Sequence, residues 1–172
     1  MLEEISRLSG VLFLVIIALV ILIPIALAHV PKEADGNNTL ETAFEVNDPT
    51  KSWAIYSEIH ESGEAEYYRL ELEEGQILRA NIFVPNKNGF VPNLVIAGPN
   101  LENEGEIPGN VEVPEGYGHI FIRGDLGDPE YEPFTPASYY YLADYEGEVA
   151  ETNSYFVIVT ETDDTGNYGL AI

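Results

Sequence analysis

The side chains best suited to chemistry lie in one segment, residues 124–138, which is rich in glycine, proline, acidic and aromatic residues. Calcium binds about six to eight oxygen atoms of carboxylates and carbonyls in flexible loops. The spacing of the acids does not match an EF-hand, and solvated loop acids remain the alternative. The candidate calcium ligands are Asp125, Asp128, Glu130 and Glu132.

Aromatic side chains cluster in the same segment and just after it. Tyrosine combines a large apolar face with a polar tip and is favoured in binding surfaces. If residues 139–141 form a strand, alternate side chains point to opposite faces, so Tyr140 lies near the core with its two neighbours outward, or the reverse. The predicted binding residues are Tyr131, Phe134, Tyr139 and Tyr141.

Other catalytic chemistry has less support. The three histidines are far apart, and no serine has the Gly-x-Ser-x-Gly setting of a nucleophile elbow. Neither a serine hydrolase nor a three-histidine metal site is therefore indicated. A glycosidase needs one carboxyl group kept protonated by burial near another that stays ionised. The many acids leave a hydrolase with such a carboxylate pair as an alternative, beside the simpler interpretation of a solvated acidic surface.

The composition of the 172-residue chain excludes several classes of protein. Seven Lys plus Arg against 30 Asp plus Glu give a net charge of −23, which disfavours nucleic acid as a partner. The absence of cysteine excludes disulfides, a thiol nucleophile and cysteine-type metal sites. A hydrophobic fraction of 45%, with 11 Tyr and 7 Phe, predicts a folded domain despite the charge.

Residues 1–30 are predicted to be a transmembrane anchor or a signal segment. No full charge occurs from Leu8 to Pro31, and residues 11–28 are almost purely aliphatic, long enough to span a bilayer. The start is not basic, which favours an uncleaved anchor, whereas Ala26-Leu27-Ala28 has the form of a cleavage site. We expect a single pass, with residues 8–30 in the cell membrane and the rest of the chain on the extracellular side.

After this segment we expect a polar linker over residues 31–38 and an exported domain over residues 39–172. Asn37-Asn38-Thr39 is a glycosylation sequon, so Asn37 is a candidate glycosylation site, with an unmodified linker as the alternative. The domain contains eight or nine short β-type runs separated by turns, which predicts an all-β sandwich or barrel. The runs 66–72 and 77–84 flank Gly75 and are predicted to pair as a hairpin.

The order of these runs resembles the bacterial pre-peptidase C-terminal domain, which is similar to the collagen-binding modules of secreted proteases. The resemblance covers residues 38–172. It implies a jelly-roll-like sandwich, export and an accessory role, and the related collagen-binding modules bind calcium. Collagen binding is not carried over, because this domain directly follows a membrane segment and has an extra loop. The segments that carry the resemblance are 38–43, 63–72, 74–78, 92–100 and 166–172.

We therefore expect a non-catalytic, membrane-anchored extracellular module that binds a cell-surface protein or a polysaccharide, or has a structural role. One alternative is an exported hydrolase, which should show a cleft with two facing acids. Another is a small subunit of a cell-envelope complex that assembles through its membrane helix. A binding module should instead show a flat or loop-lined aromatic surface.

Overall fold

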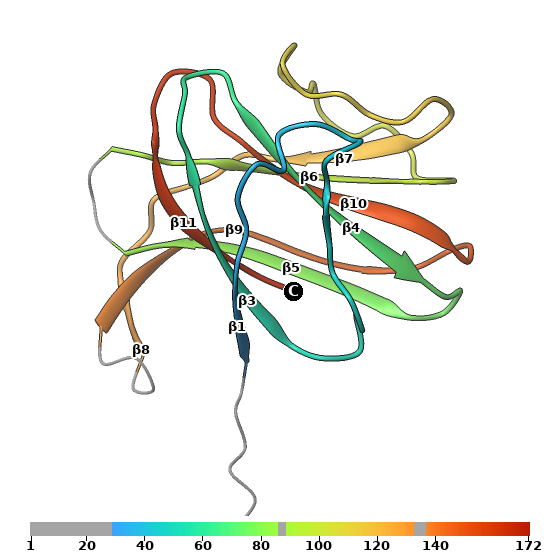
Figure 1. The fold of residues 1–172 in the computed structure, drawn as a ribbon, viewed down its shortest axis with the longest axis horizontal. Helices are drawn as coiled ribbons and strands as arrows, with labels where there is room; N and C mark the ends of the chain where they lie inside the picture. Colours follow the sequence, from blue (N-terminus) through green and yellow to red (C-terminus); the bar gives the residue numbers. More distant parts are fainter. Residues whose placement is uncertain (1–28, 86–88, 133–136) are drawn as a thin grey trace, which may run out of the picture.

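The computed structural model describes residues 29–85, 89–132 and 137–172, and in these ranges the protein contains eleven strands and no helix (Figure 1). The predicted membrane anchor falls almost entirely on residues 1–28, which lie outside the described residues. No helix in the described ranges is long and apolar enough to cross a membrane.

The strands form two sheets that pack face to face (Figure 1). All pairs are antiparallel except β1 with β3 and β2 with β4. The six-stranded sheet has the order β1 (Val30–Glu33), β3 (Trp53–Ile59), β11 (Gly166–Ala171), β5 (Ile77–Val84), β9 (Ala137–Glu148) and β8 (Glu130–Glu132). The five-stranded sheet has the order β2 (Phe44–Glu45), β4 (Ala65–Leu72), β10 (Asn153–Thr160), β6 (Asn93–Gly98) and β7 (Gly118–Ile122).

The main core lies between the sheets and follows from the alternation of side chains along each strand. On β3, Ile55 and Ile59 are fully buried in this core, whereas Tyr56 points to the outer face of the sheet. On β4, Tyr68 and Leu70 alternate along the strand onto one face and belong to the same core. The all-β, two-sheet architecture predicted from these patterns is thus confirmed.

The five-stranded sheet is buried on its second face as well. A smaller apolar cluster, which includes Tyr67, Val95 and Phe156, is covered by residues of the long connection between β6 and β7, among them Val111 (Figure 1, yellow). Burial on both faces explains why β6 and β10 read as continuous apolar runs rather than alternating ones. The outer face of the six-stranded sheet carries the pocket described below.

The predicted hairpin between residues 66–72 and 77–84 is wrong. β4 and β5 belong to different sheets, so the turn at Gly75 carries the chain across the sandwich. Gly75 has the expected positive φ, +84°, but its amide donates to the carbonyl of Val149 rather than across a hairpin. β10 and β11 likewise lie in different sheets. Alternation identifies the inward face of each strand, and that pattern fits a hairpin and a crossing equally well.

The folded domain begins earlier than the predicted boundary at residue 39. Residues 31–33 of the expected linker, together with Val30 of the preceding predicted segment, form β1, which pairs in parallel with β3. Beyond β1, the amide of Ala34 donates to the carbonyl of Tyr56. The sequence does not predict β1, because this strand is short and two of its four residues are charged.

Candidate functional site

The loop acids lie on the surface, and the segment that holds them is more ordered than its sequence suggests. The amide of Asp125 donates to the carbonyl of Leu142, and Leu126 packs against the main core. β8 pairs with the start of β9, so the described part of the segment of residues 124–138 contains strand structure. Asp125, Asp128 and Glu130 are exposed, whereas the side chain of Glu132 and all of Phe134 lie outside the described residues.

Within the described part of the chain, no three His, Asp or Glu side chains gather in a way that could hold a metal ion. Calcium binding at Asp125 and Asp128 therefore stays a prediction from the sequence. Its test is the melting temperature of the full chain across millimolar calcium, because a ligand of the folded state raises that temperature. The rise should disappear in the Asp125→Asn, Asp128→Asn double variant, and an unchanged melting curve for the parent protein would remove the prediction.

The aromatic residues of β9 alternate as the first of the two predicted arrangements requires. Tyr140 packs against the main core, and Tyr139 and Tyr141 lie on the outer face of the six-stranded sheet. Tyr131, on the edge strand β8, is 65% exposed and pairs with Ser138, so it lies on the opposite face of the sheet from Tyr139. The structure therefore brings two of the four predicted binding residues together.

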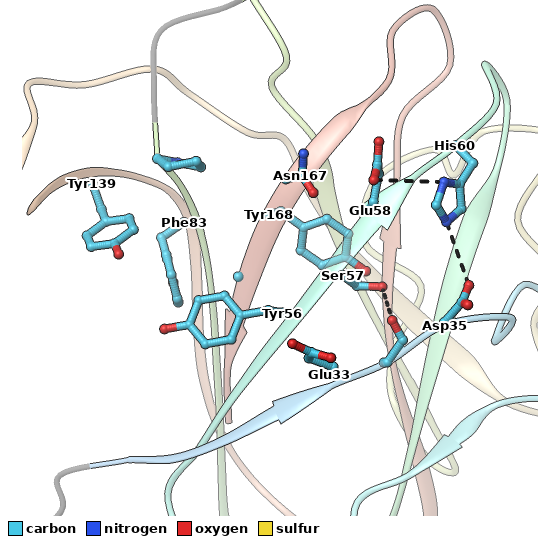
Figure 2. A pocket seen from close by; sticks show the side chains of 13 residues that line it. Glu33, Asp35, Tyr56, Ser57, Glu58, His60, Phe83, Tyr139, Asn167 and Tyr168 are labelled. Carbon is cyan, nitrogen blue, oxygen red and sulfur yellow. Dashed lines mark hydrogen bonds and ion pairs between the residues drawn. The ribbon is translucent and has the colours of Figure 1, made fainter. Parts of the chain in front are cut away.

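These two tyrosines meet further aromatic residues that come from β3 and β5. The ring centroid of Phe83 lies 5.2 Å from that of Tyr139, 5.9 Å from that of Tyr141 and 6.0 Å from that of Tyr56. The Phe83 ring is nearly perpendicular to those of Tyr56 and Tyr139, at 86° and 83°. Three rings from three strands are thus set edge to face on one surface (Figure 2).

Strand register explains why they meet. Tyr56 pairs with Gly169 of β11, Gly169 pairs with Phe83, and Phe83 pairs with Tyr141, so all four positions lie in one row across the sheet. Glu33 of β1 extends the row beyond Tyr56. The Phe83 ring lies directly over Gly169, where an added Cβ would come within 2.1 Å of it. The glycine provides the space for the tip of the Phe83 ring against the sheet.

The row borders a pocket of about 500 Å³, hereafter the groove. Its aromatic side is formed by Tyr56, Phe83 and Tyr139, and its polar side by acids, His60 and Asn167 (Figure 2). His60 Nε2 lies 3.7 Å from a carboxylate oxygen of Asp35, and Nδ1 lies 4.0 Å from one of Glu58. The acids that line the groove are Glu33, Asp35 and Glu58.

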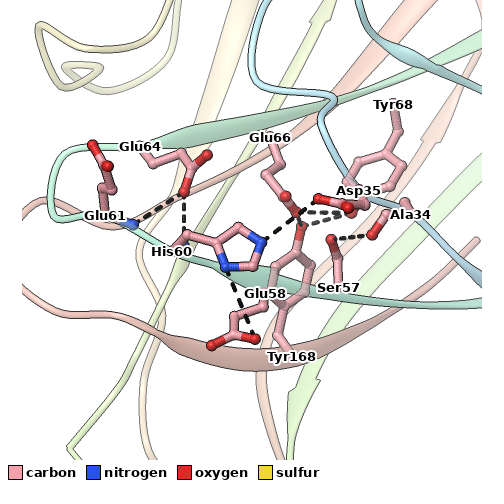
Figure 3. A network of polar contacts seen from close by, with 10 residues as sticks. All are labelled: Ala34, Asp35, Ser57, Glu58, His60, Glu61, Glu64, Glu66, Tyr68 and Tyr168. Atoms are coloured by element: carbon pink, nitrogen blue, oxygen red, sulfur yellow. Dashed lines mark hydrogen bonds and ion pairs between the residues drawn. The ribbon is translucent and has the colours of Figure 1, made fainter.

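A buried polar network lies behind the groove (Figure 3). The carboxyl group of Glu66, which is 1% exposed, accepts hydrogen bonds from the hydroxyls of Tyr168 and Tyr68, and those hydroxyls are 2.6 Å apart. The Ser57 hydroxyl donates to the carbonyl of Ala34 at 2.9 Å. Burial raises the pKa of Glu66, and it also raises the pKa of Tyr68 and Tyr168. Since Tyr168 and Ser57 both line the groove, this network supports its floor.

Sequence reasoning missed Tyr56, Phe83 and Gly169 as site residues. A signal was present in the alternation of β3 and β5, where Ile55 and Ile82 must face the core and the aromatic residues next to them must face outward. What the sequence did not contain was the strand order that places the three segments side by side.

The candidate glycosylation site Asn37 is 2% exposed. Its Nδ2 donates to the carbonyl of Tyr67 at 3.1 Å. A glycan is attached to this same nitrogen, so modification of the folded protein would require this buried side chain to become exposed.

Comparison with models of protein families finds none that matches this chain, and comparison with curated protein sequences finds no similar one.

Proposed function

We propose that the protein is a non-catalytic, membrane-anchored extracellular binding module whose ligand occupies the groove. The observation that carries this proposal is the set of three aromatic rings from β3, β5 and β9 on one sheet face beside a polar wall. Binding sites are typically concave, with aromatic walls and a few polar groups that orient the ligand.

The rings stand on strands of the sheet, next to the β-bulge where the β5–β9 register shifts between Ile82 and Phe83. Tyr56 is 37% exposed, so its ring is available to a ligand, whereas Phe83, at 9%, is held between its neighbours and Gly169. A site on strands holds its side chains more precisely than a site on loops. The two ligand classes expected from the sequence are a cell-surface protein and a polysaccharide.

Membrane attachment supports an extracellular role. β1 begins at Val30, directly after the apolar segment that ends at residue 28, and runs to Glu33 at the border of the groove. An anchored chain would thus hold the domain close to the membrane. The resemblance to pre-peptidase C-terminal domains, with their accessory binding role, is part of this proposal.

The anchor is tested by the mass of the mature protein from native membranes. We expect residues 1–28 to remain attached, because their aliphatic core is long and their start is not basic. A mature chain that begins at His29 would contradict the anchor and leave a secreted domain.

Ligand binding is tested by screening the full chain in detergent micelles against cell-surface proteins and polysaccharides. We expect Tyr56→Ala to weaken the binding of any true ligand about tenfold, because the loss of a buried aromatic contact costs more than 1 kcal/mol. Tyr131→Ala removes an exposed tyrosine outside the groove and should change affinity less than about twofold. Equal losses in both variants would contradict the proposed site.

The alternative, an exported hydrolase, is favoured only by the acids Glu33, Asp35 and Glu58 in the groove. The two functions separate in the same screen by analysis of the bound material. A binding module releases its ligand intact, whereas a hydrolase with a carboxylate pair releases shortened chains and loses this activity in Glu58→Gln.

A further inference from the structure

The groove differs from a purely apolar pocket in its charge. Glu33, Asp35 and Glu58 line it, and no lysine or arginine is present among its described lining residues. His60, between Asp35 and Glu58, is the only basic side chain of this polar side in the described structure (Figure 3). The wall therefore complements a positive charge.

The aromatic side has the geometry that also suits a cation. Tyr56 and Tyr139 each meet Phe83 at nearly a right angle, so their rings do not form one flat platform. Rings set at angles around a small space, with their faces carrying negative quadrupole charge, attract ammonium and guanidinium groups. The face of a sugar ring would instead be matched by a coplanar aromatic surface.

A second hollow, of about 390 Å³, adjoins the groove and shares His60 with it. It is lined by Glu61 and Glu64 and, among its described residues, again by no lysine or arginine. By contrast, the hollow at the β4–β5 turn contains Lys51 and Arg79. The acidic lining thus continues from the groove into the adjoining hollow, which suits several positive charges rather than a single small ion.

We infer that the groove takes a lysine ammonium group presented by a basic polypeptide segment, whose further positive charges lie along the adjoining acidic hollow. This inference rests on the proposed function, because it names the ligand of the same site. The net charge of −23 should steer such a segment to the protein and make its binding weaken with salt.

The test uses the full chain in nonionic micelles, with fluorescent decalysine as the probe and fluorescence anisotropy as the readout. We expect decalysine to bind, and decalysine acetylated at every Nζ not to bind. Tyr139→Leu, which keeps the apolar volume but removes the aromatic face, should weaken binding roughly fivefold. The double variant Glu33→Gln, Glu58→Gln should weaken it roughly tenfold.

Matched controls separate the groove from general attraction to an acidic protein. Tyr131→Leu and the double variant Glu102→Gln, Glu115→Gln remove the same chemical groups at exposed positions outside both hollows. These controls should change the affinity less than about twofold. Melting temperatures of all variants show whether each still folds. Tyr139→Phe keeps the aromatic ring and should bind decalysine about as tightly as the wild type.

The inference is overturned if decalysine does not bind, or if groove variants and controls lose affinity equally. Tight binding of chitosan oligomers without binding of decalysine would identify an amino sugar and overturn the polypeptide ligand. If a neutral polysaccharide binds and Tyr139→Leu abolishes this binding, the proposed function is upheld and only the inference of a cationic ligand is overturned. If every tested ligand binds the groove variants as tightly as the wild type, both the proposed function and this inference are overturned.

Discussion

Replacing Glu66 by glutamine is expected to make the protein more stable than the wild type at alkaline pH. The free energy of unfolding of this variant should also depend less on pH. In the wild type, burial raises the pKa of this carboxyl group in the folded state. The folded protein then binds more protons than the unfolded chain, so stability is complete below the unfolded pKa of about 4.3 and is lost as the pH rises through the folded pKa. Glutamine carries no charge to desolvate and keeps an oxygen that can accept from Tyr168.

The measurement is the free energy of unfolding by denaturant between pH 4 and pH 9. The difference should grow in favour of Glu66→Gln as the pH rises, by about 1.4 kcal/mol for each unit by which folding raises the pKa. Glu71→Gln is the control with the opposite sign, because hydrogen bonds from Ser154 and Arg69 lower the pKa of this exposed carboxyl group. If the free energies of unfolding of the wild type and Glu66→Gln change in parallel with pH, the raised pKa of the buried Glu66 carboxyl group is contradicted.

The second large effect is expected at Gly169. Gly169→Ala places a Cβ within 2.1 Å of the end of the Phe83 ring, so the ring must leave its place in the groove. Overpacking of this kind costs roughly 1–3 kcal/mol of stability. Displacement of Phe83 also breaks its edge-to-face contacts with Tyr56 and Tyr139, so ligand binding should fall together with stability.

A double-mutant cycle checks the cause. Phe83→Leu shortens the side chain, and the double variant Gly169→Ala, Phe83→Leu should therefore be more stable than the sum of the two single effects predicts. Gly109→Ala is the matched control, since its added Cβ meets no atom within 4 Å, and it should leave stability almost unchanged. Additive effects at Gly169 and Phe83 would contradict the contact.

Much of the fold follows from local pattern, and the rest depends on pairing over long distances. Alternation places Tyr68 and Leu70 on one face of β4, which the structure buries in the core. It limits Tyr139 to Tyr141 to two arrangements, one of which the structure selects. Alternation could not distinguish a hairpin within one sheet from a crossing between the sheets at Gly75, because the positive φ of this residue is compatible with either turn. That distinction depends on the hydrogen bond to Val149, which is 74 positions away.

The candidate site shows the same division. The sequence singled out Tyr139 and Tyr141 because they lie in a local cluster of tyrosines. Phe83 and Gly169 have no local feature that marks them, and their role appears only when β5, β9 and β11 stand side by side. Composition drew attention to Asp125 and Asp128 through their acidity alone, and the side chains at these positions point to no common centre with a third ligand in the described structure.

Photocrosslinking provides the most direct test of the groove as the ligand site. The full chain is prepared with benzoylphenylalanine in place of Tyr139 and, separately, in place of the exposed Tyr131, and each is irradiated on cells that display it. A ligand adduct should form from position 139, should be suppressed by excess unlabelled protein, and should be absent from position 131. An adduct from position 131 with none from position 139 would contradict ligand binding in the groove.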